Sequence, residues 1–181
     1  MWLLLKEKTN FFTKNIKLLH IAPELCFINI FRRMKNLEYI SADIESPLAM
    51  VRLDVHDIPF PKENFDVVFC NHVMEHVDDD IKAMSEIYRV LRRGGWAIIQ
   101  SPVYTSLATT FEDPSITDPK QRERAYGQND HQRKYGLDYA DRLRKAGFQV
   151  TEDDFLNELS AATRTRYALP KEEIIYFCEK R

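Results

Sequence analysis

Three side chains that could take part in metal chemistry lie together in the segment His72-Val73-Met74-Glu75-His76. In zinc hydrolases with the pattern H-x-x-E-H, two histidines on one face of a helix bind the metal and a third ligand completes the site. Residues 77–80 indicate the run-in to a new helix, so we expect both histidines in a loop or short turn. Zinc hydrolysis is therefore disfavoured, and the sequence predicts no metal site.

Two carboxylates form a second candidate site. Asp43 and Asp54 each stand near the end of a segment that reads as a strand, residues 36–44 and 48–55. A carboxylate can accept two hydrogen bonds at once, as recognition of a pair of hydroxyls requires. Acids are also common in turns, but their paired placement favours binding. His20 ends another apolar run, and a structural histidine and a ligand contact explain it equally well.

The elements that must position these residues alternate along the chain. Apolar or strand-like runs predict strands at residues 16–22, 36–44, 48–55, 65–70, 96–103, 148–155 and 172–180. Helices are expected at residues 25–34, 78–95 and 135–148, the second starting at Asp78 or Asp79 and ending at Gly94 or Gly95. This alternation predicts an α/β fold, a doubly wound, mostly parallel seven-stranded Rossmann-like sheet with helices on both faces.

In such a sheet, ligands bind outside the carboxyl ends of the strands. The candidate positions are therefore residues 20–24, Asp43, Asp54 and residues 71–76. Residues 104–134 show no sustained period, and a loop of this length in one domain of residues 1–181 is usually functional. We call this loop the lid. Tyr126 and His131 in the lid are candidates for substrate contact or a catalytic base, although core packing and anchoring of the loop explain them equally well.

The composition narrows the class of protein. The chain has 181 residues, of which 44% are hydrophobic and 30% charged, and its net charge of -2 gives no footprint for nucleic acid or anionic lipid. Three cysteines without a C-x-x-C pair argue against disulfides and favour a reducing cytoplasm. The opening residues 1–8 are too short an apolar run to cross a bilayer and predict a helix packed on the core.

The middle of the chain resembles class I S-adenosylmethionine-dependent methyltransferases. Residues 53–103 carry an acid before "IPF", then "FDVV", "EHV" and a segment ending "LRRGG", in the order typical of that family. The motifs "LHIAPE" at residues 19–24 and DH-x-R-x-YG at residues 130–136 are similar to those of a largely uncharacterised bacterial subgroup. The resemblance implies S-adenosylmethionine as the cofactor.

The resemblance also implies roles for individual residues. Asp43, with Ile44 beside it, would accept the ribose hydroxyls, and Asp54 would accept the adenine amino group, with the Val55 backbone beside the ring. Asn71 and His72 would line the methionine end of the cofactor. Ile58 and Phe60 would support the adenine pocket from behind.

The loop after the first strand departs from the family pattern of an acid followed by G-x-G, because it reads His20-Ile21-Ala22-Pro23-Glu24. S-adenosylmethionine has no phosphate, so a cradle of backbone amides is not required. The loop must provide space, and Ala22 is the next smallest residue. Pro23 would fix a rigid turn, and Glu24 could face the ammonium or sulfonium charge.

These observations predict an S-adenosylmethionine-dependent methyltransferase with a small-molecule acceptor. Methyl transfer depends chiefly on alignment of the nucleophile, methyl group and sulfur, so no catalytic constellation need be visible. A nicotinamide-dependent oxidoreductase is disfavoured because no G-x-G-x-x-G follows any strand. A catalytically degenerate binding or scaffold protein of the same fold is the alternative. The acceptor and the oligomeric state are not fixed by the sequence.

Overall fold

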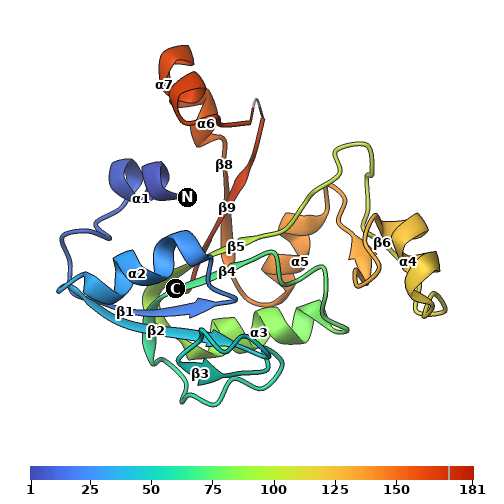
Figure 1. The fold of residues 1–181 in the computed structure, drawn as a ribbon, viewed down its shortest axis with the longest axis horizontal. Coiled ribbons are helices and arrows are strands. Elements are labelled where there is room, and N and C mark those ends of the chain that lie inside the picture. The colour runs from blue at the N-terminus through green and yellow to red at the C-terminus, as the bar shows by residue number, and fades with distance from the viewer. Residues whose placement is uncertain (171) are drawn as a thin grey trace.

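The computed structural model describes residues 1–170 and 172–181, which form one seven-stranded sheet with the order β3-β2-β1-β4-β5-β9-β8 (Figure 1). The strands β1 to β5 pair in parallel, and β9 runs antiparallel to both of its neighbours. Their bounds, in sheet order, are β3 (Val51–Arg52), β2 (Leu37–Asp43), β1 (Ile16–Ile21), β4 (Phe65–Asn71), β5 (Leu91–Gln100), β9 (Ile175–Glu179) and β8 (Gln149–Asp153).

Helices cover both faces of the sheet, which confirms the predicted doubly wound α/β class. Along β4, Val67 and Phe69 pack with α1 (Trp2–Lys8), α2 (Leu25–Arg33) and α6 (Phe155–Glu158). Val68 and Cys70 point to the other face and pack with α3 (Asp80–Val90) and α5 (Tyr139–Lys145). The alternation follows from the period of two residues in a strand. A further helix, α7 (Ala161–Arg166), contributes no buried residue.

The helix expected over residues 78–95 begins as predicted but ends earlier. Asp79 caps α3 by accepting a hydrogen bond from the backbone of Lys82. The helix stops at Val90 because the backbone of Leu91 is already extended, and Leu91 opens β5 by pairing with Phe65. The register then shifts, so that Arg92 and Arg93 lie in an irregular strand and not in a last helical turn. The third strand is also shorter than expected, with two residues.

The lid contains regular structure that the sequence did not predict. Helix α4 (Pro119–Tyr126) is capped by Asp118, which accepts a hydrogen bond from Gln121, and ends at Gly127 with a φ of 96°. Strand β6 (Phe111–Glu112) pairs with β7 (Arg133–Lys134). Figure 1 shows α4 and β6 beyond the end of the sheet toward which β1 points. The lid therefore stands at the carboxyl ends of the strands.

Within the described ranges, the structure has no helix of the length and apolar character that a membrane span requires.

Candidate active site

Four of the predicted cofactor residues lie along the carboxyl edge of neighbouring strands. Ile21 pairs with Ala42 and with Cys70, so the next position along each strand holds Ala22, Asp43 and Asn71 side by side. Asp54 follows β3, the strand beyond β2. Because neighbouring strands lie about 4.8 Å apart, Asp43 and Asn71 are separated by roughly 10 Å across the edge.

The loop after β1 adopts a backbone conformation that favours glycine, although it contains none. Ala22 has a φ of 48°, in the left-handed region, and its amide donates to the carbonyl of Ala42 at 2.9 Å. This conformation costs a residue with a side chain about 1–2 kcal/mol. Pro23 then leads into α2, which begins directly after Glu24. Ala22 is therefore strained, and the loop backbone has the conformation that a glycine at this position would allow.

Behind this loop, His20, Glu24 and Asn71 form a chain of hydrogen bonds. His20 is fully buried, with Nδ1 3.2 Å from the Tyr39 hydroxyl and Nε2 2.6 Å from Glu24 Oε2. Asn71 Nδ2 donates to Glu24 Oε1 at 2.8 Å. Burial raises the pKa of Glu24, but the hydrogen bonds from His20 and Asn71 outweigh it and leave the pKa below its usual value. Both oxygens of Glu24 are therefore engaged within the protein, and His20 has the contacts of a structural histidine.

Asn71 carries an unused acceptor. Its Oδ1 is the one fully buried side-chain oxygen or nitrogen, among residues 1–170 and 172–181, that lacks a hydrogen-bond partner. Because Nδ2 is bound to Glu24, the amide orientation is fixed and Oδ1 is the free end. An unpaired buried acceptor costs about 1–3 kcal/mol, so the position suits an incoming donor.

Asn71 also borders a cavity of about 240 Å³. The lining residues of this cavity are Met1, Glu24, Phe27, Asn71, His72, Ile98, Gln100, Glu173 and Ile175.

Asp43 is oriented by its own turn. Its Oδ1 accepts hydrogen bonds from the amides of Glu45 and Ser46, both at 2.8 Å. Its Oδ2 accepts none within the described part of the chain. Ile44 beside it is 51% exposed and, with Asp43, borders a cavity of about 470 Å³. One carboxylate oxygen is therefore held in place and the other is available to a ligand.

Asp54 and Val55 occupy the next turn along the edge. Asp54 Oδ1 accepts from the backbone amide of His56 at 2.9 Å and lies 2.8 Å from His56 Nδ1. The backbone hydrogen bond lowers the pKa of Asp54, so the carboxylate is ionised at neutral pH. Val55 is buried, and so is Ile58, while Phe60 packs edge-on against Phe65.

The segment with the H-x-x-E-H pattern forms a turn, as predicted, and not a helix. His72 has a φ of 56°, and its exposed ring places Nδ1 3.3 Å from Glu75 Oε1. Glu75 is buried and accepts a hydrogen bond from the Ser101 hydroxyl at 2.7 Å. Burial raises the pKa of Glu75, but the hydrogen bonds from His72 and Ser101, together with one to its own backbone, leave it below its usual value.

The two predicted catalytic residues of the lid have different surroundings. Tyr126 is 1% exposed and its hydroxyl accepts from the backbone amide of Asp113 at 2.9 Å, which is a packing contact. His131 is buried against His76, with ring centroids 4.7 Å apart and an interplanar angle of 87°. The geometry thus disfavours substrate contact by Tyr126, whereas it places His131 beside the turn after β4.

The motif DH-x-R-x-YG fastens the lid to that turn. Arg133 donates to the carbonyls of Met74, Val77 and Asp78 at 2.6–2.8 Å, and the Tyr135 hydroxyl donates to Met74 at 2.9 Å. A Cβ on Gly136 would lie 2.6 Å from the backbone of Thr109, so this position requires glycine.

A buried ion pair supports the same region. Arg142 in α5 donates through two nitrogens to both oxygens of Asp80, each at 2.7 Å. Sequence reasoning did not single out Asp80, Arg142 or the contacts of Arg133. The fixed spacing of arginine and tyrosine in the motif was the available signal.

Another cavity, of about 590 Å³, lies at the opposite edge of the sheet, by the amino ends of β1, β2 and β4. Lys17, Asp66 and Arg92 are among its lining residues, and it contains none of the predicted site residues. The carboxyl edge is therefore the candidate site.

The sheet order and the helices on both faces define a Rossmann-like α/β domain. Residues 14–99 match the family model Methyltransf_11, described as a methyltransferase domain. The chloroplastic 2-methyl-6-phytyl-1,4-hydroquinone methyltransferase 2 of Oryza sativa subsp. japonica is 32% identical over 98 residues, which cover 53% of this chain and 24% of that protein. The chain thus spans about a quarter of the length of this curated relative.

Solved structures share the fold at low identity. A putative methyltransferase from Bacillus halodurans C-125 has a TM-score of 0.57 and 18% identity, over 92% of this chain and 89% of that chain. The [4+2]-cyclase SpnF has a TM-score of 0.62 and 14% identity, over 92% and 76%. The family match covers residues 14–99, slightly less than half of the chain, and the solved structures share its fold.

Proposed function

We propose that this chain transfers a methyl group from S-adenosylmethionine to a small-molecule acceptor, and that it belongs to the bacterial subgroup with the two motifs described above. The observation that carries the proposal is the row of Asp43, Ala22 and Asn71 on adjacent strands, with one free acceptor oxygen at each end. A cytoplasmic location is proposed as well, since all three cysteines are free thiols.

The residues of the carboxyl edge fit the parts of the cofactor. Asp43 Oδ2 would accept the ribose hydroxyls, and Asp54 and Val55 would meet the adenine. Asn71 Oδ1 would accept from the ammonium group and so gain the partner that it lacks in the protein. When bound, the cofactor supplies an activated methyl group on a sulfonium.

The protein contributes alignment and exclusion of water. The His20–Glu24 pair holds Asn71 in one orientation, so the methionine end would be fixed before the acceptor arrives. The ionised Glu24 lies behind Asn71 and favours positive charge at this end of the edge. The lid, carried by residues 104–134, would close over the acceptor and keep the reacting groups aligned.

The acceptor is proposed to be small and partly apolar. The cavity beside Asn71 has about 240 Å³, and its lining combines Phe27, Ile98 and Ile175 with the polar Gln100. The rice relative acts, by its name, on a hydroquinone that carries a phytyl chain, and a cavity of about 240 Å³ would hold the ring of such a compound but not the chain.

Calorimetry with S-adenosylhomocysteine tests the proposal. We expect the wild-type protein to bind, and Asp43→Asn to weaken binding about 10-fold or more, since a hydrogen bond to a charged group contributes about 1.5–3 kcal/mol. Glu45→Gln is the matched control, because it removes a neighbouring charge on the same cavity but leaves the Asp43 carboxylate intact. Absence of heat with folded protein at high ligand concentration would favour the scaffold alternative.

A further inference from the structure

Three candidate metal ligands meet beside the carboxyl edge of the sheet, where the lid contacts the turn after β4. Glu75, His76 and His131 each offer one ligand atom, and these atoms all lie within 4.8 Å of one another. We propose that these three residues bind one divalent transition-metal ion, with zinc as the expected occupant. This site uses the glutamate and second histidine of the H-x-x-E-H pattern, and a lid residue in place of His72.

The donor set suits such an ion. Two imidazoles and one carboxylate form the protein ligands of several zinc and non-haem iron sites, in which the remaining positions bind water or substrate. Donor atoms about 2.0–2.1 Å from a tetrahedral zinc lie roughly 3.4 Å apart, so the group has to contract only modestly. His76 and Glu75 lie in a turn and His131 in the lid, where such small shifts are easily accommodated.

Two of the three candidate ligands, His76 and Glu75, also have a polar partner that orients the side chain. His76 Nδ1 lies 3.2 Å from Asp130 Oδ2. The Ser101 hydroxyl donates to Glu75 Oε2. Histidines that bind metals nearly always donate their other ring nitrogen to a carboxylate, carbonyl or water, and bound carboxylates are themselves hydrogen-bonded. His76 and Glu75 therefore have supporting contacts of this kind, and His131 is held by burial against the His76 ring.

The charge of Glu75 supports the assignment independently. Its side chain is 3% exposed, and its one ion-pair partner among the described residues is His72, at 3.3 Å and 67% exposed. A buried carboxylate is stabilised far better by a cation held in the same place than by an exposed imidazole. The His76 side chain is 35% exposed and provides access from solvent.

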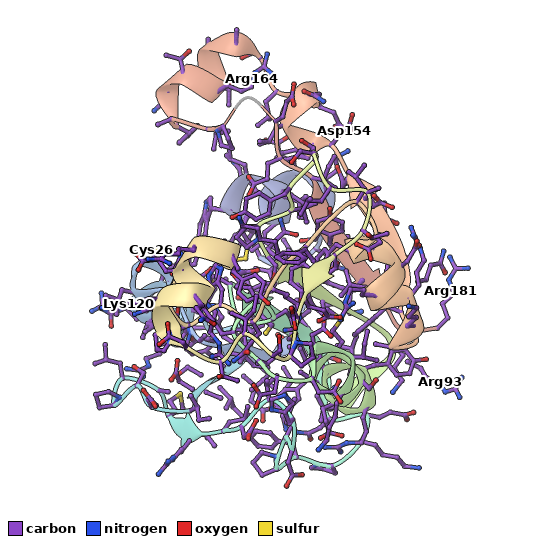
Figure 2. All side chains as sticks on the ribbon, turned by 90° about the vertical axis from the view of Figure 1, so that its right-hand side faces the viewer. Cys26, Arg93, Lys120, Asp154, Arg164 and Arg181 are labelled. Atoms are coloured by element: carbon purple, nitrogen blue, oxygen red, sulfur yellow. The ribbon has the colours of Figure 1, made fainter. Side chains whose placement is uncertain are left out.

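A second acidic group does not qualify. Asp153, Asp154 and Glu158 also bring ligand atoms together, but Asp154 and Glu158 are exposed and Glu158 already pairs with Lys8. Figure 2 shows Asp154 far from Lys120 of the lid helix, so this group is separate from the proposed site.

Zinc binding by the full chain tests the proposal, in a Cys26→Ser background that removes the exposed thiol. Calorimetry is expected to give one zinc per chain, and Co²⁺ to give the visible absorption of a low-coordinate site. His131→Gln and Glu75→Gln should each reduce zinc affinity about 100-fold or more, since even loss of an outer partner costs 10–100-fold. His56→Gln is the matched control, because His56 also pairs with a carboxylate but lies outside the group.

Two results would overturn the proposal: a folded protein that binds zinc no more tightly than millimolar, or undiminished zinc affinity in folded His131→Gln. Circular dichroism reports whether each variant is folded. Should the buried variants fail to fold, Asp130→Asn decides, because Asp130 is exposed and its contact with His76 Nδ1 would leave Nε2 as the metal ligand. A reduction of about 10-fold supports the site, and unchanged affinity contradicts it.

Discussion

The loop after β1 and the lid depart from expectation in opposite ways. The loop lacks every glycine of its family pattern, yet Ala22 adopts the left-handed φ that a glycine would supply. The lid shows no periodicity, yet Arg133 and Tyr135 fix its return to the sheet by hydrogen bonds to backbone carbonyls. In the loop, backbone geometry persists although the residue types have changed. In the lid, a few side chains determine where an irregular backbone lies.

The largest expected effect concerns the ion pair that supports the lid region. Asp80→Asn leaves Arg142 without its buried partner and should lower the free energy of unfolding by about 3–5 kcal/mol. The side chains of Asp80 and Arg142 are 2% and 14% exposed. Urea denaturation measures the change.

Arg144→Gln provides the comparison for this pair. Arg144 also bonds two carboxylates, Asp141 and Glu152, but all three side chains are at least 43% exposed. We expect a loss of less than about 1 kcal/mol. Equal losses of free energy of unfolding in Asp80→Asn and Arg144→Gln would show that burial of the Asp80–Arg142 pair contributes nothing to stability.

An intermediate effect concerns the pH dependence of the loop. The pKa of Glu24 is lowered in the folded protein, so its stabilising contribution is present above the pKa of the unfolded chain and is lost as pH falls through the folded pKa. At pH 7 the free energy of unfolding of the wild type should therefore exceed that of Glu24→Gln by about 1 kcal/mol. This amount allows for the 33% exposure of the Glu24 side chain to solvent.

That difference should shrink as the pH falls below about 4. Urea denaturation of both proteins across this range measures it. A difference that grows on acidification would contradict the assigned sign.

The smallest effect tests the strained alanine. Ala22→Gly removes the cost of a side chain in the left-handed region but adds flexibility to the unfolded chain, so a net gain of about 0.5–1 kcal/mol is expected. Ala168, with a φ of 49°, is the matched position away from the edge. Both glycine variants should be stabilised in urea denaturation, and a loss at Ala22 alone would mean that its methyl group packs productively.

Much of the fold follows from local patterns. The apolar runs predicted the positions of the seven strands along the chain, and Asp79, one of two predicted caps, was a correct start for α3 because a cap depends on residues close in sequence. The end of α3 was missed because Leu91 pairs with Phe65, a contact that no local pattern reveals. Helix α4 was also missed, although Asp118-Pro119 and Gly127 are ordinary start and stop signals.

The candidate site also has residues that local sequence patterns predict and residues that only contacts between distant segments bring together. Sequence reasoning could place Asp43, Asp54 and Asn71 because each follows or ends a parallel strand, and the carboxyl ends of parallel strands lie at the same edge of the sheet. The closeness of His131 to Glu75 and His76 was not, since it depends on how a loop returns after more than fifty residues. The pattern H-x-x-E-H contains two of the three ligands of the proposed metal site, and the third, His131, comes from the lid.

The way in which the lid begins and ends has a consequence for evolution. Its two ends meet, since Val103 pairs with Tyr135 and the amide of Tyr104 donates to the Tyr135 carbonyl at 2.9 Å. The residues between those ends form a surface loop that leaves the sheet and returns to it at the same place. Surface loops of this kind tolerate changes of sequence. Under the proposed function, a change of sequence within residues 114–125, which leaves the contacts of Thr109, Glu112 and Tyr126 in place, would alter the cover over the acceptor while the sheet and its carboxyl edge stay unchanged.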